Sequence, residues 1–299
     1  MSTATRRATW ALILCVLFLA AATALGGCGG EGPGEVLQIG GIPDQEAAKL
    51  ARRFNTVADY LRDELDVQVE YVPSVDYAAL VTAFKNGDVH LGWFGGLTGV
   101  QARDASPGAR AIAQRPRDTE FHSVFVAGSD LEVTSLEDLK GLTFTFGSES
   151  STSGHLMPRH FLLQAGVDAD ADFQGLPGYS GSHDKTWKLV ESGSFQAGAL
   201  NEAVWQKAVD DGKVDLGKVR VFFTTPPYFD YNWSVRGDLD QAFGEGFTQR
   251  IQSALMSLSP SQEGEKEILD LFQAQGFVPS DNGNYEAIED VARDLGIIR

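Results

Sequence analysis

The feature that most constrains the fold is a regular alternation of short apolar strands with amphipathic helices, which begins at residue 36. Residues 36–42 read as a strand. The segment after them repeats apolar residues three and four apart from Ala47 to Leu65, as one buried helix face does. Strand patterns at 67–72 and 90–94 follow, with a second helix pattern between them. This order predicts an α/β fold with mostly parallel sheets and helices on both faces.

The alternation restarts in the middle of the chain. A strand at 120–127 leads out of the first unit, and further strands and helices continue to residue 223. Pro226 and Pro227 interrupt the chain after that point, and the remainder is mostly helical. We therefore predict two lobes with a ligand cleft between them, because ligands of open α/β sheets bind at the carboxyl ends of the strands.

The predicted division gives the first lobe two separate pieces of chain. Residues 36–127 form its first part, residues 128–223 form the second lobe, and residues 224–299 form a crossover and a return to the first lobe. Links near 127–130 and 223–230 are expected to act as hinges when the cleft closes around a ligand.

The first 27 residues predict a secretion signal. Arg6 and Arg7 precede an apolar run from 10 to 25, which is shorter than the roughly 20 residues of a bilayer span. The run ends in Gly-Gly-Cys28, and this ending resembles a bacterial lipobox, in which Cys28 is lipidated and the peptide before it is removed. Residues 28–35 then form a Gly-rich tether. An ordinary signal peptide with an incidental cysteine is the alternative. With lipidation, the protein would be anchored to the cell membrane and face outside the cytoplasm.

Cysteine count and charge exclude several kinds of chemistry. Cys15 lies inside the signal, so Cys28 alone remains, and a disulfide, a cysteine nucleophile and a cysteine-bound metal are excluded. Without the signal, 22 basic residues face 41 acidic ones, a formal charge of −19. This charge disfavours nucleic acid as a partner. It still permits an anionic small ligand, provided that the site supplies oriented N–H groups.

A polar run, Ser151-Thr152-Ser153-Gly154, follows a strand and precedes a helix pattern. In that position the free N–H groups of the first helical turn and the hydroxyls would form a cradle for an oxyanion. An ordinary Ser/Thr helix cap is the alternative. Pro158 stands inside the helix pattern, so it predicts a kink or a second helix start.

Three segments of the chain resemble the phosphonate-type substrate-binding proteins of ABC importers. They are residues 76–80 with 87–95, residues 151–154 with Pro158, and the polar residues at 182–184, 201–202 and 230. The resemblance implies the type 2 periplasmic-binding fold and the capture of a small oxyanion for an ABC permease and its ATPase, by a monomer without a cofactor. A narrower likeness, in residues 94–99 and 181–186, is to a branch described as selenate-binding.

The same resemblance implies which side chains face the ligand: Tyr77, Phe94, Ser151, Thr152, Ser153, His183, Asn201, Glu202 and Asp230. Tyr77 has a core aromatic as its alternative role, and His183 a surface or capping histidine. Phe94 stands where phosphonate binders commonly have tyrosine, and the lost hydroxyl points to a different or smaller ligand. Glu202 and Asp230 would accept a hydrogen bond from a protonated oxyanion or an amine. Glu202 has a solvated surface charge as its alternative role.

Enzymatic and metal-binding functions are disfavoured. Ser153 and His183, with Asp184 or Asp230, form a triad only on paper, because no Gly-x-Ser-x-Gly nucleophile elbow is present. His155 and His160 are five residues apart, whereas two metal ligands share a helix face at a spacing of four. The alternative function is a ligand-sensing lipoprotein of the same fold, which binds an amine or another small metabolite and signals to a receptor.

Overall fold

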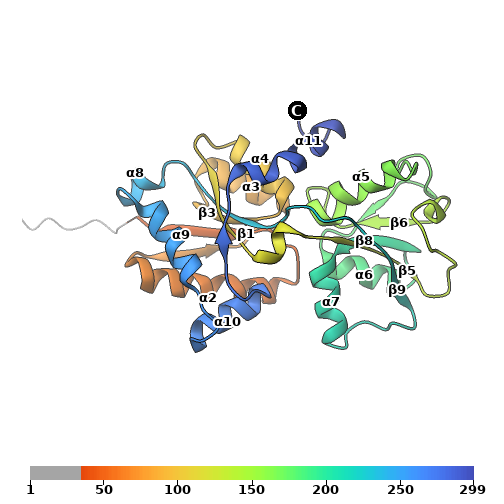
Figure 1. The fold of residues 1–299 in the computed structure, drawn as a ribbon, viewed down its shortest axis with the longest axis horizontal. Helices are drawn as coiled ribbons and strands as arrows, with labels where there is room; N and C mark the ends of the chain where they lie inside the picture. The colour runs from red at the N-terminus through yellow and green to blue at the C-terminus, as the bar shows by residue number, and fades with distance from the viewer. Residues whose placement is uncertain (1–34) are drawn as a thin grey trace, which may run out of the picture. The chain divides into compact units, whose positions relative to one another are not determined.

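The computed structural model describes residues 35–299, so the predicted signal, Cys28 and most of the tether lie outside the described residues. Within this range the strands form one six-stranded and one five-stranded sheet. Figure 1 shows the two sheets with their helices side by side. We call the part built on the six-stranded sheet the first lobe and the part built on the five-stranded sheet the second lobe. The predicted two-lobed α/β fold is confirmed.

The sheet of the first lobe takes strands from both ends of the described chain. Their order is β11-β4-β10-β3-β1-β2. The strands are β1 (Leu37–Gly41), β2 (Val69–Val72), β3 (Leu91–Phe94), β4 (Arg110–Gln114), β10 (Asn232–Val235) and β11 (Val278–Pro279).

The helices of the first lobe come from the same two pieces of chain. They are α2 (Ala47–Leu65), α3 (Tyr77–Asn86), α4 (Gly96–Asp104), η1 (Pro116–Thr119), α8 (Leu239–Phe243), α9 (Phe247–Ser257), α10 (Glu263–Phe272), η4 (Asn282–Tyr285) and α11 (Glu286–Asp294). Helix α2 buries Leu50, Phe54, Val57 and Leu61, the face that the sequence spacing predicted.

The sheet of the second lobe has the order β7-β6-β8-β5-β9. Its elements are β5 (Ser123–Gly128), η2 (Glu137–Leu139), β6 (Phe144–Phe146), η3 (Thr152–Leu156), α5 (Met157–Gln164), β7 (Gly178–Tyr179), α6 (His183–Glu191), β8 (Ala197–Asn201), α7 (Glu202–Asp210) and β9 (Val219–Thr224).

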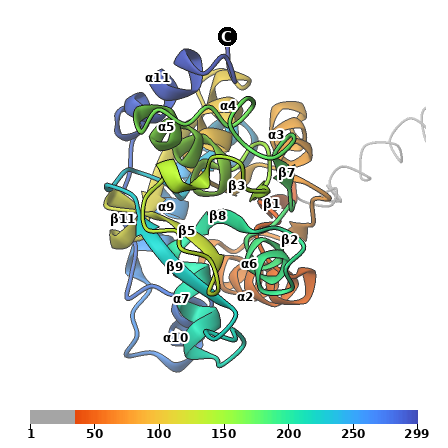
Figure 2. The same cartoon turned by 90° about the vertical axis from the view of Figure 1, so that its right-hand side faces the viewer.

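Strand β5 shows why this sheet is covered on both faces. Its residues alternate between two apolar clusters: Phe125 packs with Leu162 of α5, whereas Val126 packs with Trp187 of α6 and Trp205 of α7. Figure 2 looks at the second lobe end on and shows α5 on one side of the sheet and α6 with α7 on the other.

The strands mostly point in one direction, as predicted, but the ladders between them are mixed. Four of the nine ladders are parallel and five are antiparallel. The antiparallel ones arise largely because each sheet takes up one strand that comes directly from the other lobe, β5 in the second sheet and β10 in the first. Such a strand enters its sheet against the direction of its neighbours.

One of the two predicted links between the lobes, at 127–130, is not where the structure has it. Strand β5 belongs to the second sheet, where it pairs with β8 and β9 through Ala127, so the expected link at 127–130 is wrong. The lobes are joined instead where Phe121 pairs with Tyr228, just before β5 and just after β9. No glycine or proline interrupts residues 120–127, so the sequence gave no sign of where the chain passes from one lobe to the other. The second expected link, at 223–230, does contain the crossover.

No helix within residues 35–299 has the length and apolar content that crossing a bilayer would require.

Candidate functional site

Most of the predicted site residues meet where the two lobes touch. Tyr77 begins α3, Ser151 caps η3, whose first residues are Thr152 and Ser153, His183 begins α6, and Asp230 lies in the crossover before β10. All of these side chains are 2 % exposed or less. The structure therefore brings together residues that lie up to about 150 positions apart in the chain.

The loop that carries Ser151, Thr152 and Ser153 is held in place by its own hydrogen bonds. Ser151 Oγ accepts from the N–H of Gly154 at 2.9 Å, and Gly147 N–H donates to Gly154 O at 2.8 Å. A Cβ atom at Gly154 would lie 2.9 Å from Ser151 Oγ and 3.1 Å from Gly147 Cα, so only glycine fits there. A short π-helix follows, and α5 begins anew with Pro158 in its first turn. The predicted second helix start at Pro158 is confirmed.

His183 presents a neutral hydrogen-bond donor. The N–H of Asn201 donates to His183 Nδ1 at 3.3 Å, so Nδ1 is the unprotonated nitrogen and Nε2 carries the hydrogen. Burial lowers the pKa of His183 to about 4, against the nearby carboxylates of Asp44 and Asp184, which raise it. Nε2 is buried and has no partner among the described residues.

Tyr77 combines the two roles that the sequence left open. Its ring belongs to the apolar core of the first lobe, whereas its hydroxyl is buried without a partner in the described part of the chain. Burial, together with the charges of Asp44 and Asp230, raises the pKa of Tyr77 well above its usual range. The hydroxyl therefore keeps its proton and can donate it in a hydrogen bond.

Asp230 presents a carboxylate oxygen to the same place. Its Oδ1 accepts from the N–H of Gly96 at 2.9 Å, at the start of α4, while Oδ2 has no partner in the described residues. Burial raises the pKa of Asp230 to about 7, although the Gly96 N–H and the hydroxyls of Thr152 and Ser153 lower it. Near neutral pH this carboxyl is therefore poised between its two protonation states.

Asp44 is a site residue that the sequence analysis missed. It follows β1 and is 2 % exposed, and its Oδ2 accepts from Tyr231 Oη at 2.9 Å. Its Oδ1 has no hydrogen bond in the described chain, and the nearest cation, Arg53 Nη1, is 3.8 Å away. The signal was its position directly after the first strand, since ligands bind at the carboxyl ends of strands.

These free atoms account for most of the unpaired polar atoms of the interior. Six buried side-chain atoms lack a partner within residues 35–299, and four of them belong to Asp44, Tyr77, His183 and Asp230. Buried polar groups are nearly always satisfied, so a cluster of unsatisfied ones marks the place of a ligand or ordered water. The cluster offers two neutral donors and two carboxylate acceptors.

Three predicted residues have other surroundings. Phe94 packs edge-on against Phe84 in the first-lobe core, with ring centroids 5.3 Å apart. The side chain of Asn201 caps α7 and donates to Tyr231 Oη at 3.0 Å, so it reaches the site through Tyr231 and Asp44. Glu202 is half-buried at the start of α7. Direct ligand contact by these three residues stays a prediction.

Hydrogen bonds between the lobes hold the cleft closed over these side chains. Leu97 N–H donates to Thr152 Oγ1 at 2.9 Å, and His183 N–H donates to Asp44 O at 3.1 Å. At the surface, Lys188 Nζ lies 2.9 Å from Glu46 Oε1.

A groove of about 950 Å³ opens between the lobes beside this closed site. Its lining includes sequence neighbours of three site residues: Gln45 next to Asp44, Asp76 next to Tyr77, and Ser182 next to His183. The groove is therefore the solvent-facing space adjacent to the buried cluster.

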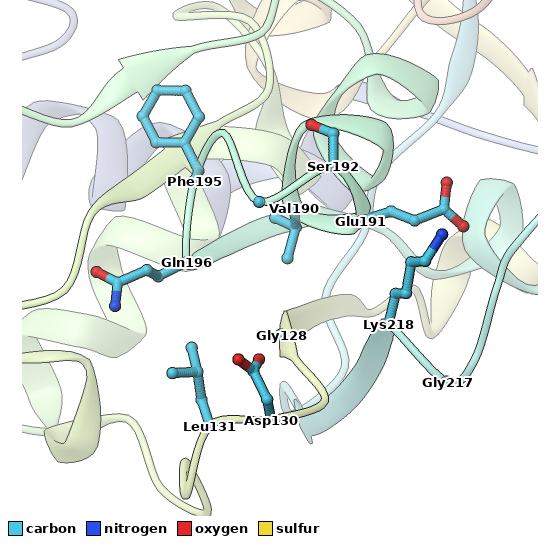
Figure 3. Close-up of a pocket in the computed structure, with 11 residues that line it drawn as sticks. Gly128, Asp130, Leu131, Val190, Glu191, Ser192, Phe195, Gln196, Gly217 and Lys218 are labelled. Atoms are coloured by element: carbon cyan, nitrogen blue, oxygen red, sulfur yellow. The ribbon is translucent and has the colours of Figure 1, made fainter.

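A second cavity, of about 630 Å³, lies at the opposite end of the second lobe (Figure 3). It is lined by Gly128, where β5 ends, and by Gln196, directly before β8. Both strands meet the cleft with their other ends, so this cavity is separate from the cluster. Among the described residues, no group of three or more His, Cys, Asp or Glu side chains is arranged to hold a metal ion.

Comparisons with known proteins point to one family. Residues 39–285 match the family described as ABC transporter, phosphonate, periplasmic substrate-binding protein. The probable ABC transporter phosphite-binding protein PhnD1 of Prochlorococcus marinus (strain MIT 9301) is 46% identical over 272 residues, which cover 89% of this chain and 91% of that protein.

Solved and curated relatives agree with this match. The structure of PhnD1 from Prochlorococcus marinus in complex with methylphosphonate superposes with a TM-score of 0.86, covering 88% of this chain and 99% of that chain. The phosphate-import protein PhnD of Mycolicibacterium smegmatis is 24% identical, over 89% of this chain and 88% of its own length.

Proposed function

The chain belongs to the family of periplasmic substrate-binding proteins of phosphonate ABC transporters, and from this membership we propose that it captures a small phosphorus oxyanion of the methylphosphonate or phosphite class. It is the substrate-binding component of an importer. Its partners are therefore a small ligand and the permease and ATPase of that importer.

The observation that carries the proposal is the cluster of unpaired atoms between the lobes. Tyr77 Oη and His183 Nε2 are buried donors with no partner in the described residues, and the loop at 151–153 lies beside them. Neutral donors of this kind bind an anion without a lysine or arginine in direct contact, since each donates along a fixed direction in a site shielded from water. The nearly complete burial of the site favours a small ligand.

Cleft closure is the proposed mechanism. The ligand enters from the groove between the lobes and is then enclosed by donors from both sides, Tyr77 from the first lobe and Ser151 to Ser153 with His183 from the second. Bonds such as Leu97 N–H to Thr152 Oγ1 form only when the lobes meet. Ligand contacts that exist in the closed form alone shift the equilibrium toward it.

The remaining features of the proposal concern the location of the protein. We expect Cys28 to carry a lipid anchor, because it ends a signal-like apolar run and precedes a Gly-rich tether. The anchored protein would work as a monomer on the outer side of the cell membrane, close to its permease.

Isothermal titration calorimetry on residues 29–299 tests the proposal. The panel is methylphosphonate, phosphite, phosphate, 2-aminoethylphosphonate, sulfate and selenate. We expect binding of methylphosphonate or phosphite, and a loss of roughly tenfold or more in affinity in Ser153→Ala and in Thr152→Ala, since each loses one hydroxyl of the cradle.

The control is Ser129→Ala, which removes a hydroxyl that donates to Leu216 O far from the cleft and should leave the affinity unchanged. A panel without any bound phosphorus oxyanion would reject the proposal. Unchanged affinity in both cradle variants would reject the cradle while leaving the ligand class intact.

A further inference from the structure

We propose that Asp44 is a specificity-determining residue, whose free Oδ1 accepts a hydrogen bond from an acidic O–H of the ligand, so that the site binds the protonated form of the oxyanion. This inference rests on the proposed function and adds the protonation state of the ligand. No residue near Asp44 fills this role within the described chain, so the ligand is the partner that the geometry requires.

The position of Asp44 is fixed from several sides. Tyr231 Oη donates to Oδ2 at 2.9 Å and itself accepts from Asn201 Nδ2 at 3.0 Å, which ties the carboxylate to the second lobe. The backbone oxygen of Asp44 accepts from His183 N–H at 3.1 Å. The carboxylate is therefore held rigidly in the closed cleft, and Oδ1 is left as its one free acceptor.

Arg53 does not satisfy Oδ1. Its Nη1 is 3.8 Å away, beyond hydrogen-bond distance, and its Nε donates to Leu271 O at 3.1 Å. The guanidinium thus offsets the charge of the carboxylate without occupying its free oxygen. A buried acceptor left unpaired costs free energy, so a ligand that brings a hydrogen to this point gains more than one that does not.

The charge balance of the site leads to the same conclusion. Asp44 and Asp230 both have a free carboxyl oxygen, so a fully deprotonated oxyanion would be repelled by Asp44 and, whenever Asp230 is ionised, by Asp230 as well. An oxyanion that keeps one O–H meets a carboxylate with a hydrogen bond in place of this repulsion. Rejection of the wrong ligand through an unpaired acceptor is an effective way to build specificity.

Asp44 is better suited than Asp230 to accept a hydrogen bond from the O–H group of the ligand. The Thr152 and Ser153 hydroxyls already act on the Asp230 carboxyl, whose pKa is raised by burial to about 7, so Asp230 can carry a proton itself and donate it. Within residues 35–299, Tyr231 is the one hydroxyl that donates to the Asp44 carboxylate, and it donates to Oδ2.

Several other titratable or charged groups surround Asp44. They are Arg53 on α2, Tyr71 on β2, Tyr77 on α3, Arg115 before η1, His183 and Asp184 on α6, and Tyr231 before β10. Burial raises the pKa of each of the three tyrosines and lowers that of His183 to about 4. The tyrosines and His183 therefore keep one protonation state between pH 5.5 and 8.5, whereas Asp230, with a pKa of about 7, changes its state in that range.

The test compares two ligands of the same shape and charge. At pH 6 methylphosphonate is a monoanion with one O–H, whereas methanesulfonate is a monoanion with none. The wild-type chain 29–299 should bind methylphosphonate at least tenfold more tightly in calorimetry. Asp44→Asn can turn an N–H toward the ligand, so this variant should narrow the ratio of the two affinities by roughly 10- to 100-fold.

Two matched variants test whether the preference for methylphosphonate depends on Asp44 and not on another nearby carboxylate. Asp76→Asn removes a negative charge beside the site but keeps a side-chain oxygen for the α3 cap, so it should retain the wild-type ratio. Asp230→Asn should keep most of the preference for methylphosphonate. If Asp230→Asn abolishes the preference and Asp44→Asn does not, the assignment to Asp44 is overturned.

A measurement on unaltered Asp44 covers the case in which Asp44→Asn does not fold. In Asp230→Asn at pH 9, where methylphosphonate in solution is mostly the dianion, the ligand should take up close to one proton on binding, measured from the heat in buffers of different ionisation enthalpy. No uptake would overturn the inference. Equal binding of methylphosphonate and methanesulfonate by the wild type would also overturn the inference about Asp44 while leaving the proposed function intact. If the wild type binds neither of these ligands and does not bind phosphite, both the inference and the proposed function are rejected.

Discussion

The two walls of the cleft are built from different chemistry. The wall of the first lobe presents the carboxylates of Asp44 and Asp230 with the Tyr77 hydroxyl, and buried arginines lie behind it. The wall of the second lobe presents the serine and threonine side chains of residues 151–153 at the start of η3, and His183, held neutral by burial, at the start of α6. The first wall thus carries both free carboxylate oxygens and one free donor, the Tyr77 hydroxyl, whereas the second carries the free Nε2–H donor of His183.

The difference shows how an acidic protein can bind an anion selectively. Under the proposed function, the donors of the second lobe would accept any small oxyanion, since they do not distinguish between them. The carboxylates of the first lobe would add the repulsion that excludes fully deprotonated anions, so we expect specificity to depend on the lobe with the charged groups.

The largest effect is expected from breaking the ion pair that supports the first wall. Arg115 lies 2.6 Å from Asp118, donates to Phe272 O at 2.8 Å and covers the Tyr231 ring, with its guanidinium carbon 4.9 Å from the ring centroid. Arg115→Leu leaves Asp118 charged and fully buried, so we expect a loss of about 3–5 kcal/mol in the free energy of unfolding, measured with urea at pH 7.

The control is Arg52→Leu, which breaks an exposed pair with Glu267 and should cost no more than about 1 kcal/mol. Equal losses in the two variants would show that the buried pair does not support the wall.

The next largest effect is a pH dependence at Asp230. The folded pKa of this carboxyl is about 7, above its ordinary value of 3.8, so folding binds a proton between these values. Its contribution to stability is present below pH 3.8 and is lost as the pH rises through 7. Asp230→Asn should therefore stabilise the ligand-free protein relative to wild type as the pH rises from 4 to 8, by up to about 4 kcal/mol. A constant difference between the two proteins across that range would contradict the assignment.

A smaller effect of opposite sign is expected at His183 on the second wall. Its folded pKa is about 4, below the ordinary 6.5, so neutral His183 contributes stability above pH 6.5 that is lost as the pH falls through 4. The measurement is the free energy of unfolding from chemical denaturation at several pH values. As the pH falls from 6.5 to 4, this free energy for His183→Gln should increase relative to that of wild type by up to about 3 kcal/mol. His155→Gln provides a comparison at a histidine outside the cluster of free atoms. Burial also lowers the pKa of His155 to about 4, so the stability of this variant relative to wild type should depend on pH in the same direction. If His183→Gln instead becomes more stable relative to wild type as the pH rises, His183 and Asp230 do not have pH dependences of opposite sign.

Local patterns predicted much of this molecule, because they depend on residues that are close in sequence. The helix face of α2 followed from apolar spacing, the new start at Pro158 from the geometry of proline, and the helix cap at Ser151, the alternative to the cradle, from serine at a helix start. The ladders between strands could not be read in this way, since strands that pair are far apart along the chain. The run 121–127 was assigned to the wrong sheet for this reason.

The sequence by itself determined the two-lobed α/β architecture and the family, both of which are encoded in periodicity and short motifs, whereas the cradle stays a prediction. Only the tertiary structure decided that Phe94 packs in the core and that Asp44, three residues after β1, shares a buried site with His183 and Asp230. The free atoms of these side chains are visible only once every other hydrogen bond has been assigned in space. Because residues from four separate parts of the chain meet in this cluster, the cluster is a property of the closed fold and could not be read from any one segment of the sequence.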